Sequence, residues 1–541
     1  MTNRPALPPE IARRRTFAII SHPDAGKTTL TEKFLLFGGA IQMAGQVRAK
    51  GEARRTRSDF MQMEKDRGIS VSASAMSFDF KTFRFNLVDT PGHSDFSEDT
   101  YRTLTAVDAA VMVIDGAKGV ESQTQKLFEV CRLRDLPILT FCNKMDRESR
   151  DTFEIIDEIQ EMLAIDVTPA SWPIGTGREF IGCYDILRDR LELMDRADRN
   201  RVAETIEING LDDPKLAQHV PAQLLEKLKE ELEMARALLP ALDPQAVLEG
   251  HMTPIWFGSA INSFGVKELM DGIANYGPEP QIQSAEPRDI APEESKVAGF
   301  VFKVQANMDP KHRDRVAFVR IVSGKFERDM NVLNTRSGER MRLGNSQRLF
   351  ARDRETVDDA YAGDVVGLVG NYDLLIGDTL ASKNGVTFHE IPRFAPECFS
   401  YLHNKSTAKY KRFRDGLQQL LKEGVASEFQ LLDAGPSQVP LLGAVGPLQF
   451  EVLQHRLEGE YAAETRIEQA SWSIARWLKP MEGDPLAPDA RPSLSLGATL
   501  ARDSNGWLVA LLPSEWAMKT FTEKNEDWII SEQPFPPPVA V

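Results

Sequence analysis

Four short motifs in this sequence carry residue types that could bind a nucleoside triphosphate. The first is Ser21-His22-Pro23-Asp24-Ala25-Gly26-Lys27-Thr28, which follows an apolar strand and opens a helix. Backbone N–H groups of such a loop can cradle phosphates at the helix N-terminus. Lys27 can reach the β- and γ-phosphates, and the Thr28 hydroxyl can bind Mg²⁺. Ser21 replaces the first Gly of the consensus, at a position expected to favour unusual backbone angles. Taken alone, the motif could also be an ordinary strand-to-helix turn.

The second motif, Asp89-Thr90-Pro91-Gly92-His93, ends another apolar strand. Asp89 is predicted to bind Mg²⁺ through water, and the Gly92 N–H to sense the γ-phosphate. His93 directly follows that sensor, where small regulatory GTPases usually hold a Gln that orients the attacking water. A lone His is more often structural, but this position favours a catalytic role for His93, whose charge responds to its surroundings.

The remaining two motifs could read a guanine base. In Asn143-Lys144-Met145-Asp146, the Asp146 carboxylate can accept two guanine N–H groups, whereas adenine presents the wrong donors and acceptors. The Lys144 stem would lie along the base. Ser259-Ala260-Ile261 could offer a backbone N–H to guanine O6, although that tripeptide alone is weak. Because all four motifs follow strands in this order, the sequence predicts GTP/GDP binding at the carboxyl edge of an open sheet.

The elements around these motifs alternate as in a parallel α/β sheet. We predict a GTP-binding domain over residues 1–280 with an insertion at about 165–250. The insertion ends in a solvated amphipathic helix, Leu224 to Leu239. Strands are predicted at Thr16–Ile20, Met76–Phe80, Phe83–Val88, Ala109–Ile114, Pro137–Phe141 and Pro254–Phe257, with the second and third as a hairpin.

Composition changes after residue 280. A Pro-rich acidic tract at 281–295 is predicted to be a linker. Period-two patterns then predict a β-barrel over 296–388, and mixed patterns predict an α+β domain over 389–541. The sequence therefore predicts an α/β P-loop domain, a β-barrel and an α+β third domain. This agrees with the roughly three or four domains expected for 541 residues.

Bulk properties narrow the functional classes. The net charge of −15 argues against gross electrostatic attachment to DNA or an acidic membrane, so RNA contacts would need local basic patches. No run of about 18 apolar residues predicts a membrane span. The N-terminus lacks a secretory pattern, although its arginines leave a transit peptide open. Four scattered cysteines are typical of reduced thiols in a cytoplasmic protein.

One further segment completes a family pattern. Arg67-Gly68-Ile69-Ser70 lies where a first switch loop belongs, and Ser70 could place a hydroxyl on Mg²⁺; a polar strand start is the alternative. With the motifs at Asp89 and Asn143, it resembles the translational GTPase superfamily, which includes elongation factors Tu and G. The resemblance implies ribosome-stimulated hydrolysis, with His93 positioned by large-subunit RNA. It also implies an apolar gate at Pro23 and Ile69, with Pro where elongation factor Tu has Val.

Longer segments narrow the resemblance to the class II peptide chain release factors of bacteria, the release-factor-three family. They are Ser21–Thr28, Met63–Ser70, Asp89–Arg102, Ala298–Arg315 and Gly446–Leu453. The resemblance spans nearly the whole chain. It implies a three-domain ribosomal GTPase that uses GTP to dislodge codon-reading release factors after peptide release. Such a protein does not itself read stop codons. A monomer is expected, with no membrane or DNA partner.

Several alternatives stay open at this point. A translocase-like or ribosome-protection GTPase is the nearest, although the chain leaves room for little beyond one domain after residue 390. A GTP-dependent binding switch without a ribosomal role is disfavoured by His93. An ATP-using enzyme is disfavoured by Asp146, and a metabolic enzyme by the lack of a second catalytic constellation. The basic clusters Lys311–Arg315 and Lys409–Arg414 suit ribosome contact, or are simply solvated faces.

Overall fold

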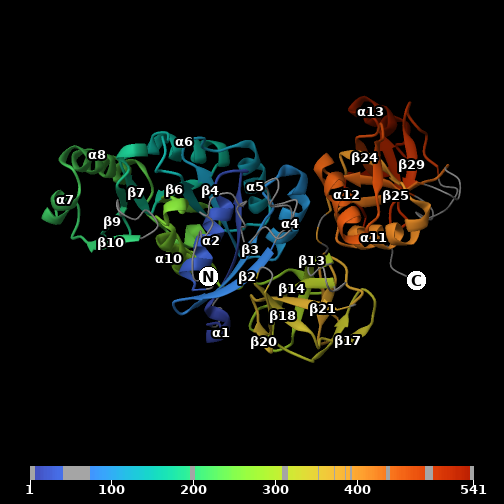
Figure 1. Ribbon diagram of the computed structural model, residues 1–541, viewed down its shortest axis with the longest axis horizontal. Helices are drawn as coiled ribbons and strands as arrows, with labels where there is room; N and C mark the ends of the chain where they lie inside the picture. The colour runs from blue at the N-terminus through green and yellow to red at the C-terminus, as the bar shows by residue number, and fades with distance from the viewer. Residues whose placement is uncertain are drawn as a thin grey trace.

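The computed structural model describes residues 6–39, 74–194, 202–306, 315–350, 353–370, 372–383, 385–389, 391, 393–433, 439–481 and 491–535. Three bodies follow one another along the chain (Figure 1): an α/β domain in blue to green, a barrel in yellow, and an α+β domain in orange to red. This order confirms the predicted fold class. Among the described helices, none combines the length and the apolar character needed to span a membrane.

The first domain is built on a seven-stranded sheet with the order β2-β3-β1-β4-β5-β11-β6. Its strands are β1 Arg14–Ser21, β2 Ser74–Phe80, β3 Phe83–Asp89, β4 Ala109–Asp115, β5 Ile138–Asn143, β6 Asp166–Pro169 and β11 Met252–Phe257. Every neighbouring pair is parallel except β2 with β3, which form the expected antiparallel hairpin. The short helix α1 (Pro9–Ala12) precedes the sheet.

Helices cover both faces of this sheet, so its central strands are buried throughout. The helices are α2 Lys27–Phe37, α4 Ser97–Thr105, α5 Ser122–Arg132, α6 Thr152–Leu163 and α10 Val266–Tyr276. Alternate residues of β1 enter two separate cores: Ala18 and Ile20 on one face, Phe17 and Ile19 on the other.

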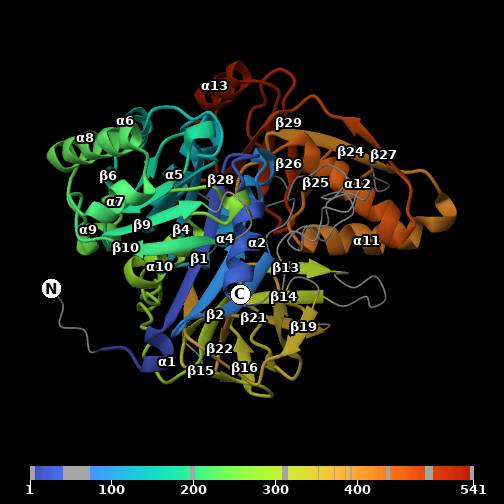
Figure 2. The same cartoon turned by 60° about the vertical axis from the view of Figure 1, so that its left-hand side comes forward.

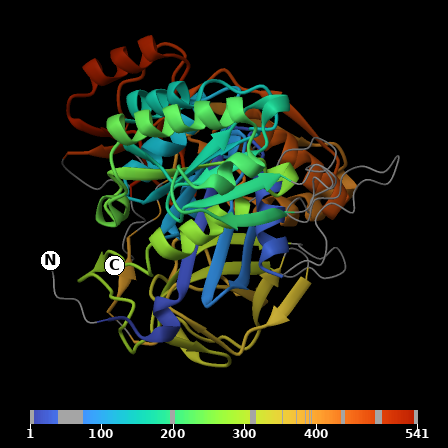
Figure 3. The ribbon, with the colours of Figure 1, turned by 90° about the vertical axis from the view of Figure 1, so that its left-hand side faces the viewer.

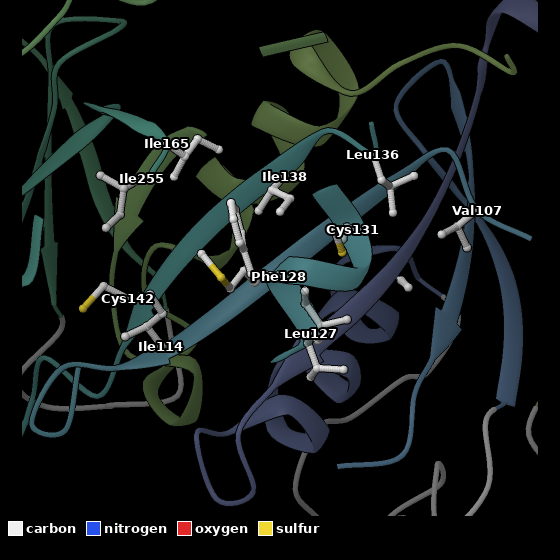
Figure 4. Packing of buried hydrophobic residues seen from close by; sticks show 14 of the residues in the cluster. Val107, Ile114, Leu127, Phe128, Cys131, Leu136, Ile138, Cys142, Ile165 and Ile255 are labelled. Atoms are coloured by element: carbon white, nitrogen blue, oxygen red, sulfur yellow. The ribbon is translucent and has the colours of Figure 1, made fainter. Parts of the chain in front are cut away.

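Helix α5 shows how tightly one of these cores is packed. Figure 4 shows Phe128 and Cys131 of α5 over strand β5, which carries Ile138 and Cys142, and all four residues belong to one buried cluster. Burial raises the pKa of the Cys131 thiol to about 12, so this side chain is protonated and packs as a small apolar group. The four cysteines form no disulfide.

The insertion forms a second, smaller sheet beside the first (Figure 3). Its antiparallel strands have the order β10-β9-β8-β7. They are β7 Ser171–Ile174, β8 Gly182–Asp185, β9 Arg190–Met194 and β10 Val202–Glu207, and the helices α7 Pro214–His219, α8 Ala222–Leu238 and α9 Pro244–Leu248 follow. Strand β6, which falls inside the predicted insertion, pairs instead with β11 in the main sheet, so the added sheet begins only at β7. Helix α8 matches the predicted amphipathic helix and buries Leu228, Leu232 and Ala235.

The tract predicted as a linker is partly ordered by pairing. Strand β12 (Ala285–Glu286) pairs with β23 (Thr387–Phe388), and Gln283 bridges Ile290. The second domain's main sheet has the order β17-β16-β22-β13-β14-β21-β18-β19, with a separate β15-β20 pair. Its strands are β13 Ala298–Ala306, β14 Arg315–Ser323, β15 Lys325–Glu327, β16 Asn331–Asn334, β17 Arg340–Arg342, β18 Ser346–Phe350, β19 Asp353–Thr356, β20 Asp359–Tyr361, β21 Val365–Gly370 and β22 Thr379–Ala381.

In the third domain, the described α-helices α11, α12 and α13 accompany an eight-stranded sheet of order β27-β24-β26-β25-β29-β30-β28-β31. The elements are β24 Cys398–Asn404, α11 Tyr410–Lys422, β25 Ser427–Leu431, β26 Leu441–Ala444, α12 Pro447–Tyr461, β27 Thr465–Gln469, β28 Ile474–Pro480, β29 Thr499–Arg502, β30 Leu508–Leu512, α13 Glu515–Lys524 and β31 Trp528–Ser531. The amphipathic pattern of α11 places Phe413, Leu417 and Leu420 in a core shared with α12.

Figure 2 shows the third domain beside both the α/β domain and the barrel. Buried polar contacts join the three domains. Between the first domain and the barrel, the Arg320 guanidinium meets the Asp108 carboxylate at 2.6 Å, with both side chains almost fully buried. Between the barrel and the third domain, the Ala306 N–H donates to Glu423 at 3.0 Å. Helix α4 and the turn before it contact the other two domains. Asp99 of α4 pairs with Lys303 of β13 in the barrel at 3.6 Å. The 3₁₀ turn η1 (Ser94–Phe96), which precedes α4, contacts α12 of the third domain.

Candidate functional site

The motifs singled out in the sequence meet at one edge of the main sheet. Strand β1 ends at Ser21, β3 at Asp89, β5 at Asn143 and β11 at Phe257, and each motif begins at or just after that end. Because these strands run parallel, their carboxyl ends share an edge. Motifs that are far apart in the sequence therefore lie close together at this edge.

Asn143 holds three of these loops together. Its side-chain Nδ2 donates to the Ala25 carbonyl at 2.8 Å, and its Oδ1 accepts the N–H groups of Lys144 and Ala260, each at 2.8 Å. The side chain is buried and uses both ends of the amide. The Ala260 N–H, one of the predicted donors to guanine O6, is therefore already engaged, which leaves Ile261 as the tripeptide's exposed residue.

The first loop has the backbone strain expected where chain wraps a ligand. Gly26 has φ 104°, and a Cβ there would lie 2.2 Å from Asn143 Nδ2, so both backbone angle and space require glycine. Asp24 also has positive φ, at 68°. Ser21 differs from expectation: it pairs with Val113 as the last residue of β1 and has no positive φ, so glycine is not needed there.

Lys27 carries a buried charge that the described protein groups do not fully satisfy. Its side chain is 6% exposed, and Nζ lies 3.5 Å from Asp89 Oδ1 without a hydrogen bond to any described residue. Leaving a buried ammonium in that state costs free energy unless a ligand supplies acceptors. Thr28 follows in the first turn of α2 and is partly exposed.

A second unsatisfied group lies at Asp146. One carboxylate oxygen of Asp146, Oδ1, is buried and accepts no hydrogen bond from a described residue. Lys144 is held nearby at φ 69°, and its Nζ lies 2.7 Å from Asp115 Oδ2. Asp115 ends β4 and was not identified from the sequence, because it belongs to no recognisable motif. Met145 is fully buried and packs behind this loop.

The loop from Thr90 to His93 is anchored at its start and open at its centre. The Thr90 hydroxyl donates to the Ile19 carbonyl at 2.6 Å, and the Thr100 hydroxyl donates to the Pro91 carbonyl at 3.3 Å. A Cβ on Gly92 would meet no described atom within 4 Å, so this side of the loop centre is not packed against the described part of the protein. His93 has a side chain that is 37% exposed and contacts Asp95 through Nδ1.

Two predicted residues cannot be placed. Ile69 of the gate and Ser70 of the metal site lie outside the described residues. The other gate residue, Pro23, is partly exposed in the phosphate loop, beside His22, whose Nε2 lies 3.3 Å from Glu121 Oε1. Among the described residues, no group of three or more His, Cys, Asp or Glu side chains could hold a metal ion.

The three domains correspond to three known family models. Residues 12–279 match the elongation factor Tu GTP-binding domain, residues 296–383 match elongation factor G domain 2, and residues 388–522 match the Class II release factor RF3, C-terminal domain. The chain is 46% identical over 523 residues to "Peptide chain release factor 3" of Gloeobacter violaceus, covering 97% of this chain and 98% of that protein.

The chain belongs to the peptide chain release factor 3 family. A relative from Bordetella avium with the same name is 50% identical over 87% of each chain. The family makes this chain a translational GTPase with a guanine-nucleotide site and a place in translation termination. A crystal structure of a protein from Thermus thermophilus has the same fold, with a TM-score of 0.67 at 22% identity, covering 92% of this chain and 73% of that one.

Proposed function

We propose that this protein is a ribosome-stimulated GTPase that promotes dissociation of codon-reading release factors from the ribosome after peptide release, without itself reading the stop codon. The observation that carries the nucleotide chemistry is the pair of buried, unsatisfied groups at the sheet edge, Lys27 Nζ and Asp146 Oδ1. One is a cation suited to phosphate and the other an acceptor suited to guanine N–H groups. The ribosomal role would place the protein in the cytoplasm.

In this proposal each motif residue has a defined task. The N–H groups of the loop from Ser21 to Thr28 and the Lys27 ammonium bind the phosphates, and Asp146 selects guanine. Thr28 and Asp89, with Ser70, would hold Mg²⁺, which would neutralise phosphate charge when bound. His93 orients the attacking water once the ribosome orders its loop, with Pro23 and Ile69 as the apolar gate.

A local basic surface supports contact with ribosomal RNA despite the acidic net charge. Lys405, Lys411 and Arg412 are exposed near the start of α11, and none forms an ion pair with another described residue. Tyr410 beside them is 56% exposed and could stack on a base. We place small-subunit or large-subunit RNA on this surface, with large-subunit RNA reaching His93. The other basic cluster, at Lys311–Arg315, lies largely outside the described residues.

The third domain favours release over translocation. Its match is to the C-terminal domain of a class II release factor, over residues 388–522. A translocase-like or ribosome-protection GTPase is the remaining alternative, because the first two domains match models that are shared with elongation factors.

The deciding experiment measures GTP turnover by the purified protein, alone and with ribosomes, with and without a bound codon-reading release factor, while that factor's departure is followed. We expect ribosomes to stimulate turnover and the factor to leave faster. Stimulation without faster departure would contradict the release role and favour the translocase-like alternative. No stimulation under any condition would contradict a ribosomal role.

Two variants test the assigned residues. His93→Ala should lower stimulated turnover by about 10²- to 10⁴-fold while nucleotide affinity is retained. Asp146→Asn should weaken the preference for GTP over ATP. Loss of nucleotide binding in the first variant would indicate a structural histidine, and an unchanged preference in the second would remove Asp146 from base recognition.

A further inference from the structure

The loop that carries His93 also contacts the third domain through one side chain. Asp95 lies two residues after His93, and its Oδ1 lies 3.1 Å from His93 Nδ1. Its other oxygen, Oδ2, accepts the N–H of Leu448 at 2.8 Å. Leu448 belongs to the first turn of α12, 353 positions away along the chain. The Asp95 carboxylate therefore touches the proposed catalytic histidine and the third domain at once.

Asp95 can hold the His93 ring in either protonation state. Besides the contact of its carboxylate, the Asp95 backbone N–H lies 3.2 Å from His93 Nδ1 and can donate to it. A neutral Nδ1 accepts this N–H, whereas a protonated Nδ1 donates to the Oδ1 oxygen. In both cases Nδ1 stays with Asp95, so the other ring nitrogen remains available to orient water. A carboxylate that orients an imidazole in this way is a recurring arrangement in hydrolytic sites.

The start of α12 needs an acceptor that the third domain does not supply. Pro447, the first helical residue, has no N–H, and Gly446 before it has no side chain. Gln449 is already engaged, because its Oε1 accepts the N–H groups of Val445 and Gly446. The N–H of Leu448 is therefore satisfied from the first domain, and a carboxylate is also favourable at the positive end of the helix.

Shape complementarity surrounds this polar contact. Phe96, the residue after Asp95, forms a separate buried cluster with Leu448 and Val452 of α12. A Cβ on Gly446 would lie 2.2 Å from Asp95 Cγ, so only glycine allows the helix start to approach the carboxylate this closely. The φ of Gly446 is −146°, which any residue can adopt, so alanine there would act through the clash and not through backbone strain. Figure 1 shows α12 on the side of the third domain that faces α4.

We propose that Asp95 is a positioning residue that couples the orientation of His93 to the docking of α12. A phosphate that accepts a hydrogen bond from the Gly92 N–H would shift the loop that carries Asp95. This shift would alter the hydrogen bond between Asp95 and the Leu448 N–H. Because coupling between two sites is reciprocal, any displacement of the third domain by the ribosome would in turn alter how His93 is held. This inference rests on the proposed catalytic role of His93.

Three variants separate the two halves of the contact. Asp95→Ala removes both. Asp95→Asn keeps an oxygen that can accept the Leu448 N–H. It places the amide NH₂ group beside His93, and that group cannot accept a hydrogen bond from a protonated Nδ1. Gly446→Ala disturbs Asp95 from the third domain without changing the GTP-binding domain. The matched control is Gly459→Ala in the same helix, where an added Cβ meets no described atom within 4 Å.

Two measurements are made on the full-length protein. The first is ribosome-stimulated GTP turnover, separated into kcat and KM, with GDP affinity measured in parallel. The second is energy transfer between dyes on Leu133→Cys and Leu496→Cys, which lie on exposed positions of the first and third domains, in a Cys398→Ser background. The remaining three cysteines are buried.

We expect Asp95→Ala and Gly446→Ala to lower kcat by about 10- to 100-fold, as a displaced catalytic group would. GDP affinity should stay near that of the parent, and energy transfer should change in both variants. Asp95→Asn should lower kcat while energy transfer is preserved, and Gly459→Ala should match the parent in both measurements. Equal kcat in the parent and Gly446→Ala, with altered energy transfer, would overturn the coupling and leave a simple domain contact.

The same experiment distinguishes failure of the proposed function. If ribosomes do not stimulate the parent protein, the ribosomal role is refuted. The single-turnover rate without ribosomes and the energy transfer in GTP and GDP then decide the coupling. Parallel changes of the two quantities across the variants would support it, and independent changes would overturn it.

Discussion

Removing the Asn143 side chain should destabilise the protein and weaken nucleotide binding, although this side chain need not touch the nucleotide. Asn143→Ala deletes three hydrogen bonds of 2.8 Å and leaves the Ala25 carbonyl and the N–H groups of Lys144 and Ala260 without their partner. Each buried group left unsatisfied costs about 1–3 kcal/mol. Because water can reach part of this edge, we expect a total near the lower limit, about 3–5 kcal/mol.

Asn143→Ala should also weaken nucleotide binding. The nucleotide would have to restore the order of the loops that the Asn143 side chain no longer connects. If half of the lost free energy is repaid on binding, affinity should fall by about 10- to 100-fold. Asn143→Asp is a useful second variant, because it keeps the acceptor for both N–H groups but places a carboxylate oxygen against the Ala25 carbonyl.

The assay compares urea-induced unfolding of the nucleotide-free protein with titration of a fluorescent GDP analogue. Asn262→Ala is the control: Asn262 is buried on the loop after β11, which Asn143 contacts through Ala260, and its side chain donates a hydrogen bond to Ser259 at 2.9 Å. It should cost about 1 kcal/mol and change affinity little. Full stability of Asn143→Ala with lost affinity would refute the reasoning, since it would make Asn143 a direct ligand. Lost stability with normal affinity would show that the loops are not coupled.

Three further changes test the packing and charges that support the site. Burial first, and then the hydrogen-bonded Glu268, raise the pKa of Glu192 well above its usual value. Below a pH of about 4.3, Glu192 is protonated in both the folded and the unfolded state, and its full contribution to stability is present. Above that pH the unfolded state releases the proton first, so this stability is lost as pH rises through the folded-state pKa. Glu192→Gln should therefore gain stability relative to the parent as pH rises above about 4.3 in urea titrations, and a constant difference from pH 5 to 9 would contradict this. Arg320→Met leaves the buried Asp108 carboxylate unpaired and should cost about 3–5 kcal/mol in the same assay, with recovery when Asp108→Leu is added; no recovery would argue against the ion pair as the cause. Phe128→Ala should cost about 3–5 kcal/mol through the cavity it leaves, measured by thermal unfolding, and a loss below about 1 kcal/mol would show that the core collapses to fill it.

The sequence by itself determined the local chemistry of this protein. The helix starting at Lys27, the hairpin of β2 and β3, and the barrel strands follow from short-range periodicity and turn residues, which need no distant partner. The identities of Lys27 and Asp146 likewise predict phosphate and guanine recognition, because the donor and acceptor properties of a side chain belong to the residue itself.

Some features could not be predicted because they depend on contacts between distant segments. Strand β6 lies within the range predicted as an insertion, but its edge position in the main sheet is decided by pairing with β11. The tract from 281 to 295 has the composition of a linker, yet β12 is held by a strand about a hundred residues later. Ser21 replaces a consensus glycine without strain, because its backbone is that of a strand residue.

Only the tertiary structure decided how the site is held together. Asn143 reaches Ala25 across 118 positions, and Asp95 reaches Leu448 across 353. Neither contact has a signature along the chain, since an amide or a carboxylate at a loop can pair with any exposed backbone group. The sequence specifies which groups are available, and the packing of three domains specifies which of them meet.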